Sequence, residues 1–271
     1  MRLSIVVSTH AAEFQAVALK GDFAAGVAKV ANWGYDGVEP AIRDPSLVDA
    51  AELEDLVSSL GLVVPAIGTG QAWGEEGLSF TSDDPAVRTA AIQRVRSHVP
   101  LAARLDAMVI LGLIRGITPE GQSHERSMDF LVEAIRECAA LAAETGVRFA
   151  LEPLNRYETD LVHTVAEGLD LIERVGAENF GLLLDTFHMN IEEPEIEASI
   201  RSCGDRIFHF HVADSNRWHP GAGHLDFGSI LETLSATGYE GFVSGEFMPL
   251  PDADTAAERG IAHLRHLEAK G

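Results

Sequence analysis

The feature that most constrains the fold of this chain is an eightfold alternation of short apolar, β-branched segments with longer amphipathic ones. Short segments of this kind are typical of buried parallel strands, and the stretches between them are long enough for helices. The predicted strands cover residues 3–8, 37–40, 62–68, 108–112, 148–153, 180–185, 207–214 and 242–247. Eight strand–helix units in succession predict a (β/α)8 barrel rather than an open doubly wound sheet.

Glycines mark the ends of the predicted helices. Residues 125–144 repeat apolar side chains at three- and four-residue steps, as expected for a helix with one buried stripe. In five units a glycine closely precedes the next strand, where a left-handed residue would end the helix; these are Gly34, Gly61, Gly146, Gly176 and Gly238. A last helix is expected at 255–268. Because the sequence contains no linker-like tract, we expect a single barrel domain over residues 1–271.

The charge balance limits what such a barrel can bind. The chain has 42 Asp and Glu residues against 20 Lys and Arg residues, a formal net charge of −22. Nucleic acid is therefore a poor partner, because its phosphates require a basic surface. No stretch approaches the roughly 18 apolar residues of a membrane span, so we expect a cytoplasmic protein that does not bind membranes. Cys138 and Cys203 are too few for a disulfide framework and are predicted to be core or helix residues.

Metal-binding side chains stand at the ends of the last four predicted strands. These are Glu152, Asp185, His211 and Glu246, at spacings of 33, 26 and 35 residues, about one unit each. The C-terminal strand ends of a barrel form its cleft, and residues two apart on a strand share a face, so that Glu152 would point inward with Ala150. The four side chains can therefore converge. One imidazole and three carboxylates favour a divalent ion such as Mn²⁺, Co²⁺ or Mg²⁺.

Each of these residues has a simpler explanation when it is taken alone. An Asp or Glu at a strand end often caps the next helix or accepts hydrogen bonds in a loop. Four in successive units favour a shared cation, because three unpaired carboxylates are costly to bury together. Glu158, His188 and Arg217 follow the same strand ends. Each is weak evidence singly, but together they would supply the donors and acceptors that orient a polyol.

The sequence around these strand ends resembles the D-tagatose 3-epimerase family of xylose-isomerase-like barrels. The stretches that carry the resemblance are LEPLNRYETD (151–160), LLLDTFHMNIEE (182–193), FHFHVADSNRWHPGAGHLDF (208–227) and SGEFMPLP (244–251). Four stretches of the N-terminal half look most like the branch of the family that includes 5-keto-L-gluconate epimerase. They are LKGD (19–22), IRDPS (42–46), AIGTGQAW (66–73) and LGLIRG (111–116). Nearly the whole chain is covered.

The resemblance implies an isomerase that holds one divalent metal ion per chain with the four strand-end residues and acts on a small-molecule sugar. It implies that Glu152 and Glu246 are also the acid/base pair, that Glu158, His188 and Arg217 bind substrate oxygens, and that the protein is a homodimer or homotetramer. Such a pair can invert a carbon beside a ketone, because one carboxylate removes a proton on one face and the other returns it on the opposite face. The metal would stabilise the intervening enediolate. No dinucleotide cofactor is indicated, since GTGQAWG (68–74) lacks the required spacing.

The end of the fourth strand bears on the choice of substrate. Neutral-ketose epimerases of the family often present an aromatic residue there, whereas this chain has Leu113, Ile114 and Arg115. We interpret Arg115 as a carboxylate-binding residue, because guanidinium pairs with carboxylates in a bidentate manner; the alternative is a solvent-facing loop residue. The interpretation predicts a keto-acid sugar of the 5-keto-L-gluconate or D-tagaturonate type. At a net charge of −22, such an anion would need local cations, with Arg217 and Arg115 as the candidates.

Other functions remain open at this level. The first is a neutral ketose 3-epimerase of the D-tagatose, D-allulose or L-ribulose type. The second is a C-glycoside deglycosidase-type lyase subunit, which would need a partner chain or a larger pocket. A zinc phosphodiesterase of the endonuclease IV type is disfavoured, because the early strand ends offer Glu39–Pro40, Gly68–Thr69 and Leu111–Gly112 without a histidine. A non-catalytic sugar-binding protein would not need two metal-binding glutamates.

Overall fold

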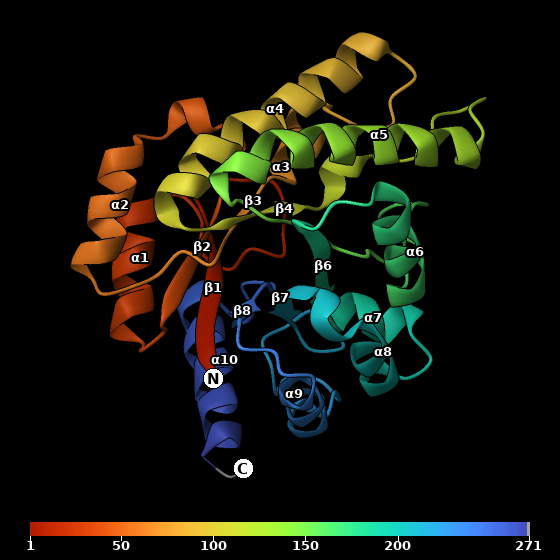
Figure 1. Ribbon diagram of the computed structural model, residues 1–271. Helices are drawn as coiled ribbons and strands as arrows, with labels where there is room; N and C mark the ends of the chain where they lie inside the picture. The colour runs from red at the N-terminus through yellow and green to blue at the C-terminus, as the bar shows by residue number, and fades with distance from the viewer. Residues whose placement is uncertain (270–271) are drawn as a thin grey trace.

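Eight parallel strands pair in the order of the sequence, and the first also pairs with the last, which closes them into a barrel. The structure is a computed structural model that describes residues 1–269 (Figure 1). The strands are β1 (Arg2–Ser8), β2 (Gly37–Ala41), β3 (Ala66–Gly68), β4 (Met108–Leu111), β5 (Phe149–Leu151), β6 (Phe180–Asp185), β7 (Ile207–Val212) and β8 (Phe242–Gly245). All eight predicted strands are confirmed, and the chain has the (β/α)8 barrel fold that its sequence predicts.

The helices surround the strands, and the N-terminus lies beside the last described helix, where Met1 pairs with Glu268 (Figure 1). The α-helices are α1 (Phe23–Asn32), α2 (Ala50–Ser59), α3 (Gln71–Glu76), α4 (Pro85–Leu105), α5 (His124–Ala142), α6 (Val165–Val175), α7 (Thr186–Glu192), α8 (Ile196–Cys203), α9 (Phe227–Ala236) and α10 (Ala253–Glu268). The helices predicted at 125–144 and 255–268 correspond to α5 and α10. Within residues 1–269, no helix combines the length and the apolar character that crossing a membrane requires.

Local sequence explains where most of these helices begin and end. The side chain that precedes the first helical residue accepts a backbone N–H bond at Asp22, Asp49, Asp84, Ser123, Thr164, Asp226 and Asp252. These caps satisfy N–H groups that have no partner inside the helix. The predicted glycine stops are confirmed, because all five have a positive φ between 67° and 85°. The third strand is shorter than predicted: it begins only after Pro65, which has no N–H for a strand ladder.

The predicted alternation along the strands is also confirmed. A small cluster fills the barrel interior and consists of Ala66, Met108, Ile110, Ala150 and Leu183, with Phe208 packed against it. The opposite faces of the same strands belong to the large core beneath the helices, for example Phe149 and Leu151. The pairing of β6 with β7 shifts register between Leu182 and Leu183. Cys138 and Cys203 are buried on α5 and α8, as predicted.

Candidate active site

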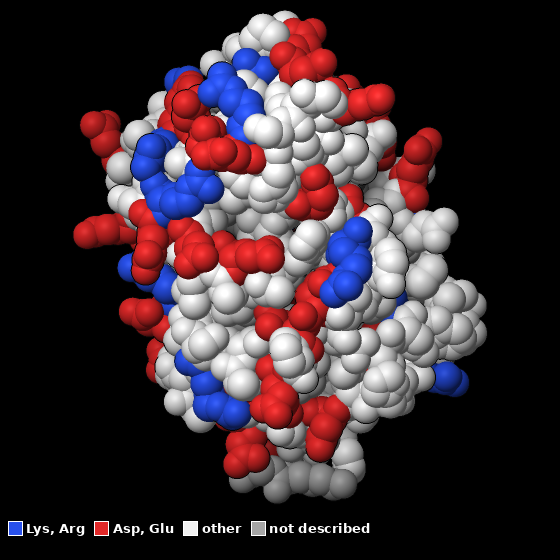
Figure 2. Space-filling model, turned by 90° about the vertical axis from the view of Figure 1, so that its right-hand side faces the viewer, with Lys and Arg blue, Asp and Glu red and all other residues white. Residues whose placement is uncertain are grey.

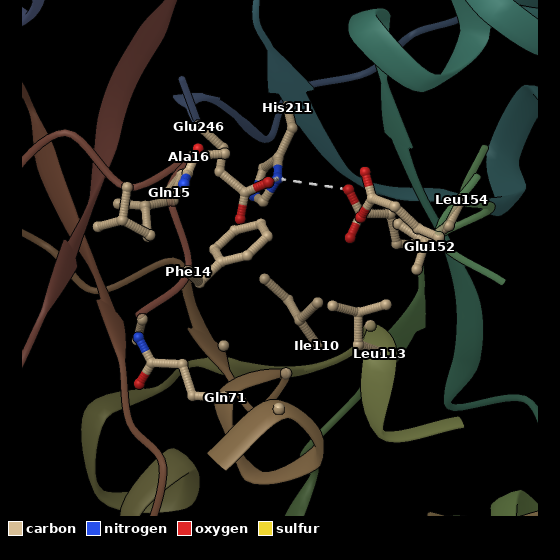
Figure 3. A pocket seen from close by; sticks show the side chains of 18 of the residues that line it. Phe14, Gln15, Ala16, Gln71, Ile110, Leu113, Glu152, Leu154, His211 and Glu246 are labelled. Carbon is tan, nitrogen blue, oxygen red and sulfur yellow. Dashed lines mark ion pairs between the residues drawn. The ribbon is translucent and has the colours of Figure 1, made fainter. Parts of the chain in front are cut away.

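A cavity of about 660 Å³ opens at the C-terminal ends of the strands. Its polar part is formed by residues at the ends of β2, β5, β7 and β8, and its apolar part by loop residues that include Phe14, Leu113 and Leu154. In Figure 3 the carboxylates of Glu246 and Glu152 face each other across this cavity, with His211 behind them. The cavity lies where the barrel architecture places catalytic groups, because only the strand-to-helix loops are free to form a cleft.

The structure brings the four predicted metal ligands together. Glu152, Asp185, His211 and Glu246 each present one ligand atom, and these atoms all lie within 4.8 Å of one another. Nδ1 of His211 is 3.8 Å from Oε1 of Glu152, 3.9 Å from Oδ2 of Asp185 and 3.9 Å from Oε2 of Glu246. These separations are too long for direct hydrogen bonds and leave room for an ion between the four atoms.

Buried polar atoms without hydrogen-bond partners also indicate an ion between these four residues. Oε1 of Glu152, Oδ2 of Asp185 and Nδ1 of His211 are buried and have no hydrogen-bond partner among the described residues. Such atoms are rare in folded proteins and call for a ligand, water or ion. Three carboxylate oxygens and one imidazole nitrogen suit a divalent ion that prefers oxygen and nitrogen donors, so the residues fit the implied metal.

The charges in this cluster repel one another strongly. Burial raises the pKa of Glu152 well above its ordinary value, and the nearby Glu246 raises it further. Burial likewise raises the pKa of Glu246, to about 7, and raises the pKa of Asp185. For His211 burial favours the neutral ring, but the charges of Glu39, Glu246 and Glu152 outweigh it and raise its pKa to about 10. Without a cation the cluster must therefore take up protons, and a bound metal would replace them.

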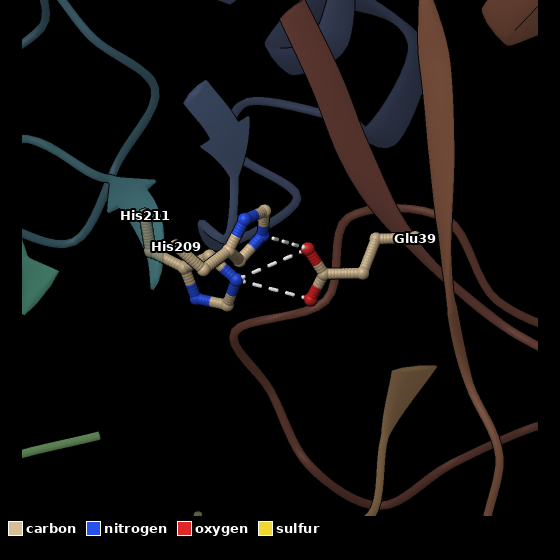
Figure 4. A group of neighbouring side chains, drawn as sticks. All are labelled: Glu39, His209 and His211. Carbon is tan, nitrogen blue, oxygen red and sulfur yellow. Dashed lines mark hydrogen bonds and ion pairs between the residues drawn. The ribbon is translucent and has the colours of Figure 1, made fainter. Parts of the chain in front are cut away.

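A fifth charged residue, which the sequence analysis did not assign to the site, contacts the cluster from behind. Glu39 lies on β2, fully buried, and its carboxylate accepts hydrogen bonds from Nε2 of His211 at 3.0 Å and Nε2 of His209 at 2.7 Å (Figure 4). Burial opposes ionisation of Glu39, but these two histidines outweigh it and hold its pKa well below the usual range. The only signal in the sequence is a glutamate inside the otherwise nonpolar strand GVEPA.

The predicted substrate-binding residues Glu158, His188 and Arg217 line the same cavity, and Asn155 links Glu158 to His188 by hydrogen bonds. Nδ1 of His188 accepts hydrogen bonds from the backbone and side-chain amides of Asn155, at 3.2 and 2.7 Å. The ring proton of His188 must then be on Nε2, which is buried, has no partner and lies 3.7 Å from Oε1 of Glu152. Burial lowers the pKa of His188 well below its ordinary value, so the ring is neutral. His188 thus presents one N–H to the cavity beside Glu152.

Arg217 lies between Glu158 and Glu246 and contacts both. Its Nη1 donates to Oε1 of Glu158 at 2.7 Å, and its Nη2 is 3.7 Å from Oε2 of Glu246. The guanidinium also lies over the ring of Phe187, 4.7 Å from its centroid. The backbone of Arg217 is left-handed, with φ of 60°, a strained conformation for a residue with a side chain. The surrounding loop holds it there: the Arg217 N–H donates to the carbonyl of Asp214, whose buried carboxylate in turn accepts several backbone N–H groups of that loop.

The interpretation of Arg115 as a carboxylate-binding residue is wrong, and so is the solvent-facing alternative. Arg115 ends a short 3₁₀ turn after β4, is fully buried and lies outside the residues that line the cavity. Its guanidinium donates to five backbone carbonyls, those of Leu111, Gly112, Glu152, Leu161 and Val162. The turn directs the side chain inward beneath Glu152, where its donors bind the backbone of two loops instead of a ligand.

Comparisons with known proteins agree with this site. A profile of the family described as xylose isomerase-like TIM barrel matches residues 27–267. The L-ribulose 3-epimerase of Mesorhizobium japonicum is 31% identical over 266 residues, which cover 97% of this chain and 88% of that protein. The D-psicose 3-epimerase of Ruminiclostridium cellulolyticum is 34% identical over 235 residues, which cover 83% of this chain and 78% of that protein.

A solved structure supports the same relationship. The crystal structure of D-allulose 3-epimerase from Methylomonas sp. in complex with D-allulose superposes with a TM-score of 0.82 at 28% identity, over 98% of this chain and 97% of that one. Profile, sequence and structure agree over nearly the full length. The chain therefore belongs to the xylose isomerase-like TIM barrel family and, within it, to the D-tagatose 3-epimerase family that its strand-end motifs resemble.

Proposed function

We propose that this protein is a metal-dependent 3-epimerase of neutral ketoses. The observation that carries the proposal is the pair Glu152 and Glu246, which approach one metal-sized site from different strands inside the cavity at the strand ends. Together with Asp185 and His211 they would hold one divalent ion, for which Mn²⁺, Co²⁺ and Mg²⁺ are the candidates. When bound, that ion would supply Lewis-acid stabilisation of the negative charge that develops as a proton leaves the carbon beside the ketone.

The two glutamates would move the proton. Epimerisation needs a base on one face of the substrate and an acid on the other, and Glu152 and Glu246 face each other across the cavity (Figure 3). Glu152 is buried and the side chain of Glu246 is only 14% exposed, so little water would compete for the proton during transfer. The Nε2–H of His188 and the guanidinium of Arg217 stand beside the pair and would fix the orientation of the sugar through its oxygens.

The charge of the cavity favours a neutral substrate. Six glutamates line it (Glu13, Glu39, Glu75, Glu152, Glu158 and Glu246), and among residues 1–269 Arg217 is the only lysine or arginine that does. Arg217 is already paired with Glu158. A sugar carboxylate would meet repulsion that this single cation does not offset, even with a divalent ion bound.

The comparisons also favour the neutral-ketose alternative over the keto-acid substrate expected from the fourth strand. The relatives described above are named for L-ribulose, D-psicose and D-allulose, which are neutral ketoses. With Arg115 buried, the residue on which the keto-acid expectation depended does not reach the substrate. We therefore choose L-ribulose, D-allulose, D-fructose and D-tagatose as the first substrates to assay.

The test combines a substrate panel with proton exchange. Purified protein with Mn²⁺, Co²⁺ or Mg²⁺ is incubated in D₂O with each neutral ketose, and with 5-keto-L-gluconate and D-tagaturonate, and deuterium at the CHOH carbon beside the ketone is followed by NMR. We expect exchange and a new epimer with neutral ketoses, and loss of both in Glu152→Gln and Glu246→Gln. Glu137→Gln is the matched control, because this exposed glutamate pairs with Arg96 on the outer helices. Exchange by the double glutamine variant, or turnover of keto acids alone, would contradict the proposal.

A further inference from the structure

We propose that Glu39 is a positioning residue that, together with His209, fixes His211 in the tautomer whose Nδ1 faces the metal site. The inference rests on the proposed metal-dependent function, and it concerns residues outside the four ligands. It assigns a role to a buried carboxylate on the second strand, across the barrel from the histidine that it contacts.

Glu39 is placed to act on His211 and on little else. It is 1% exposed, and its carboxylate reaches across the barrel interior from β2 to β7, which are not neighbours in the sheet. Oε1 of Glu39 is 3.0 Å from Nε2 of His211, and Oε2 is 2.7 Å from Nε2 of His209. Among the described residues these two rings are the hydrogen-bond partners of its side chain, and no lysine or arginine pairs with it. A buried carboxylate with such partners is not needed for packing, since an apolar side chain would fill the same space at lower cost.

The hydrogen bond to Glu39 decides which ring nitrogen of His211 carries the proton. An ionised carboxylate can only accept, so each Nε2 that contacts Glu39 must carry a proton. The lone pair of neutral His211 is then on Nδ1, the atom that faces Glu152, Asp185 and Glu246. In the other tautomer, Nδ1 would carry the proton and could not bind a metal. Carboxylate partners of this kind orient metal-binding histidines and make them better ligands.

His209 holds the carboxylate in turn. Its ring stands edge-on to that of His211, with centroids 5.2 Å apart and planes 76° from parallel. The two rings therefore approach Glu39 from different directions: Nε2 of His209 contacts Oε2, whereas Nε2 of His211 lies 3.0 and 3.2 Å from the two oxygens (Figure 4). With both oxygens engaged, the carboxylate cannot rotate away from His211 without losing a buried hydrogen bond.

The test measures metal affinity, not only activity. Dissociation constants for Mn²⁺ and Co²⁺ are obtained by competition with a chelator for the unmodified protein, Glu39→Gln, His211→Gln and the double variant, and the visible absorption of bound Co²⁺ is recorded. Nε2 of His211 lies 3.0 and 3.2 Å from the two oxygens of Glu39, so a glutamine would place a donor NH₂ group beside it in either orientation, which favours moving the proton of His211 to Nδ1. We expect Glu39→Gln to bind metal about 10- to 100-fold more weakly with an altered Co²⁺ spectrum.

The double variant separates positioning from general damage. If Glu39 acts through His211, the substitution Glu39→Gln should weaken binding little further once His211 is already glutamine. Equal losses in both backgrounds, or an unchanged dissociation constant in Glu39→Gln, would overturn the inference. Two ions per chain in the unmodified protein and one in Glu39→Gln would also overturn it, because Glu39, His209 and His211 would then be ligands of a second metal.

Two further variants serve as controls for this experiment. Glu39→Asp keeps the charge on a side chain shorter by one methylene; if Glu39→Gln does not fold, we expect this variant to show weakened binding with the same dependence on His211. Glu137→Gln on the outer surface should bind metal like the unmodified protein. If the unmodified protein binds no divalent ion, the proposed metal-dependent function fails; if it binds one and Glu39→Gln binds equally well, only the role of Glu39 fails.

Discussion

Replacing Arg115 with methionine should destabilise the protein without changing which sugars it accepts. Methionine has a similar length but no hydrogen-bond donor, so the five carbonyls that Arg115 now binds would lose a partner. Three of the five also accept a backbone N–H, namely those of Leu111, Gly112 and Val162. The carbonyls of Glu152 and Leu161 depend on the guanidinium among the described residues. At about 1–3 kcal/mol for each buried acceptor left without a donor, the free energy of unfolding should fall by about 2–6 kcal/mol.

The measurement is urea unfolding of the metal-free protein, compared with Arg136→Met. Arg136 is exposed and donates to two backbone carbonyls near the end of α6, those of Val175 and Arg174. Because water can replace those bonds, this control should lose less than about 1 kcal/mol. A loss below about 1 kcal/mol for Arg115→Met would refute the reasoning. A folded Arg115→Met variant that loses keto-acid turnover while neutral-ketose turnover persists would restore the carboxylate-binding interpretation.

The remaining predictions concern the loop after β7 and the acidic cluster. Arg217→Ala should raise KM for the ketose about 10- to 100-fold in steady-state kinetics, since it removes a charged donor that is paired with Glu158. Gly223→Ala should lower both the melting temperature and kcat, because a Cβ there would overlap the side chain of Asp214, which anchors the same loop. The raised pKa of Glu246, about 7 against an ordinary 4.5, means that the folded carboxyl binds a proton that the unfolded one releases between those values. Without metal, this group should therefore cost up to about 3 kcal/mol of stability as pH rises from 4.5 to 7. Urea unfolding at pH 5, 6 and 7 with a chelator tests this, and saturating Mn²⁺ should abolish the trend.

Acidic side chains are distributed over the surface of the protein. On the face drawn in Figure 2, Asp and Glu side chains are spread widely, and Lys and Arg occur in small groups among them. The net charge of −22 alone did not say which carboxylates matter. The structure separates the exposed ones from the cluster of Glu152, Asp185 and Glu246, in which Glu152 and Asp185 are buried and Glu246 is partly buried.

The sequence by itself determined the eight-unit barrel and the positions of the four candidate metal-binding residues. Both depend on local patterns: strand periodicity sets which side chains point inward, and parallel strands in a closed barrel bring their C-terminal ends to one rim. Glu152, Asp185, His211 and Glu246 could therefore be placed together without knowing any contact between them.

Only the tertiary structure decided the contacts of Arg115 and Glu39. Arg115 turns inward after a 3₁₀ turn, and its partners lie up to 47 residues away in another loop, a direction that no periodicity encodes. Glu39 meets His209 and His211 across the barrel, 170 and 172 residues along the chain. Those contacts exist only once the barrel closes, because β2 and β7 face each other through its interior without being paired. The proposed substrate preference also needed the tertiary structure, because it depends on which charged side chains reach the cavity and not on which lie nearby in the sequence.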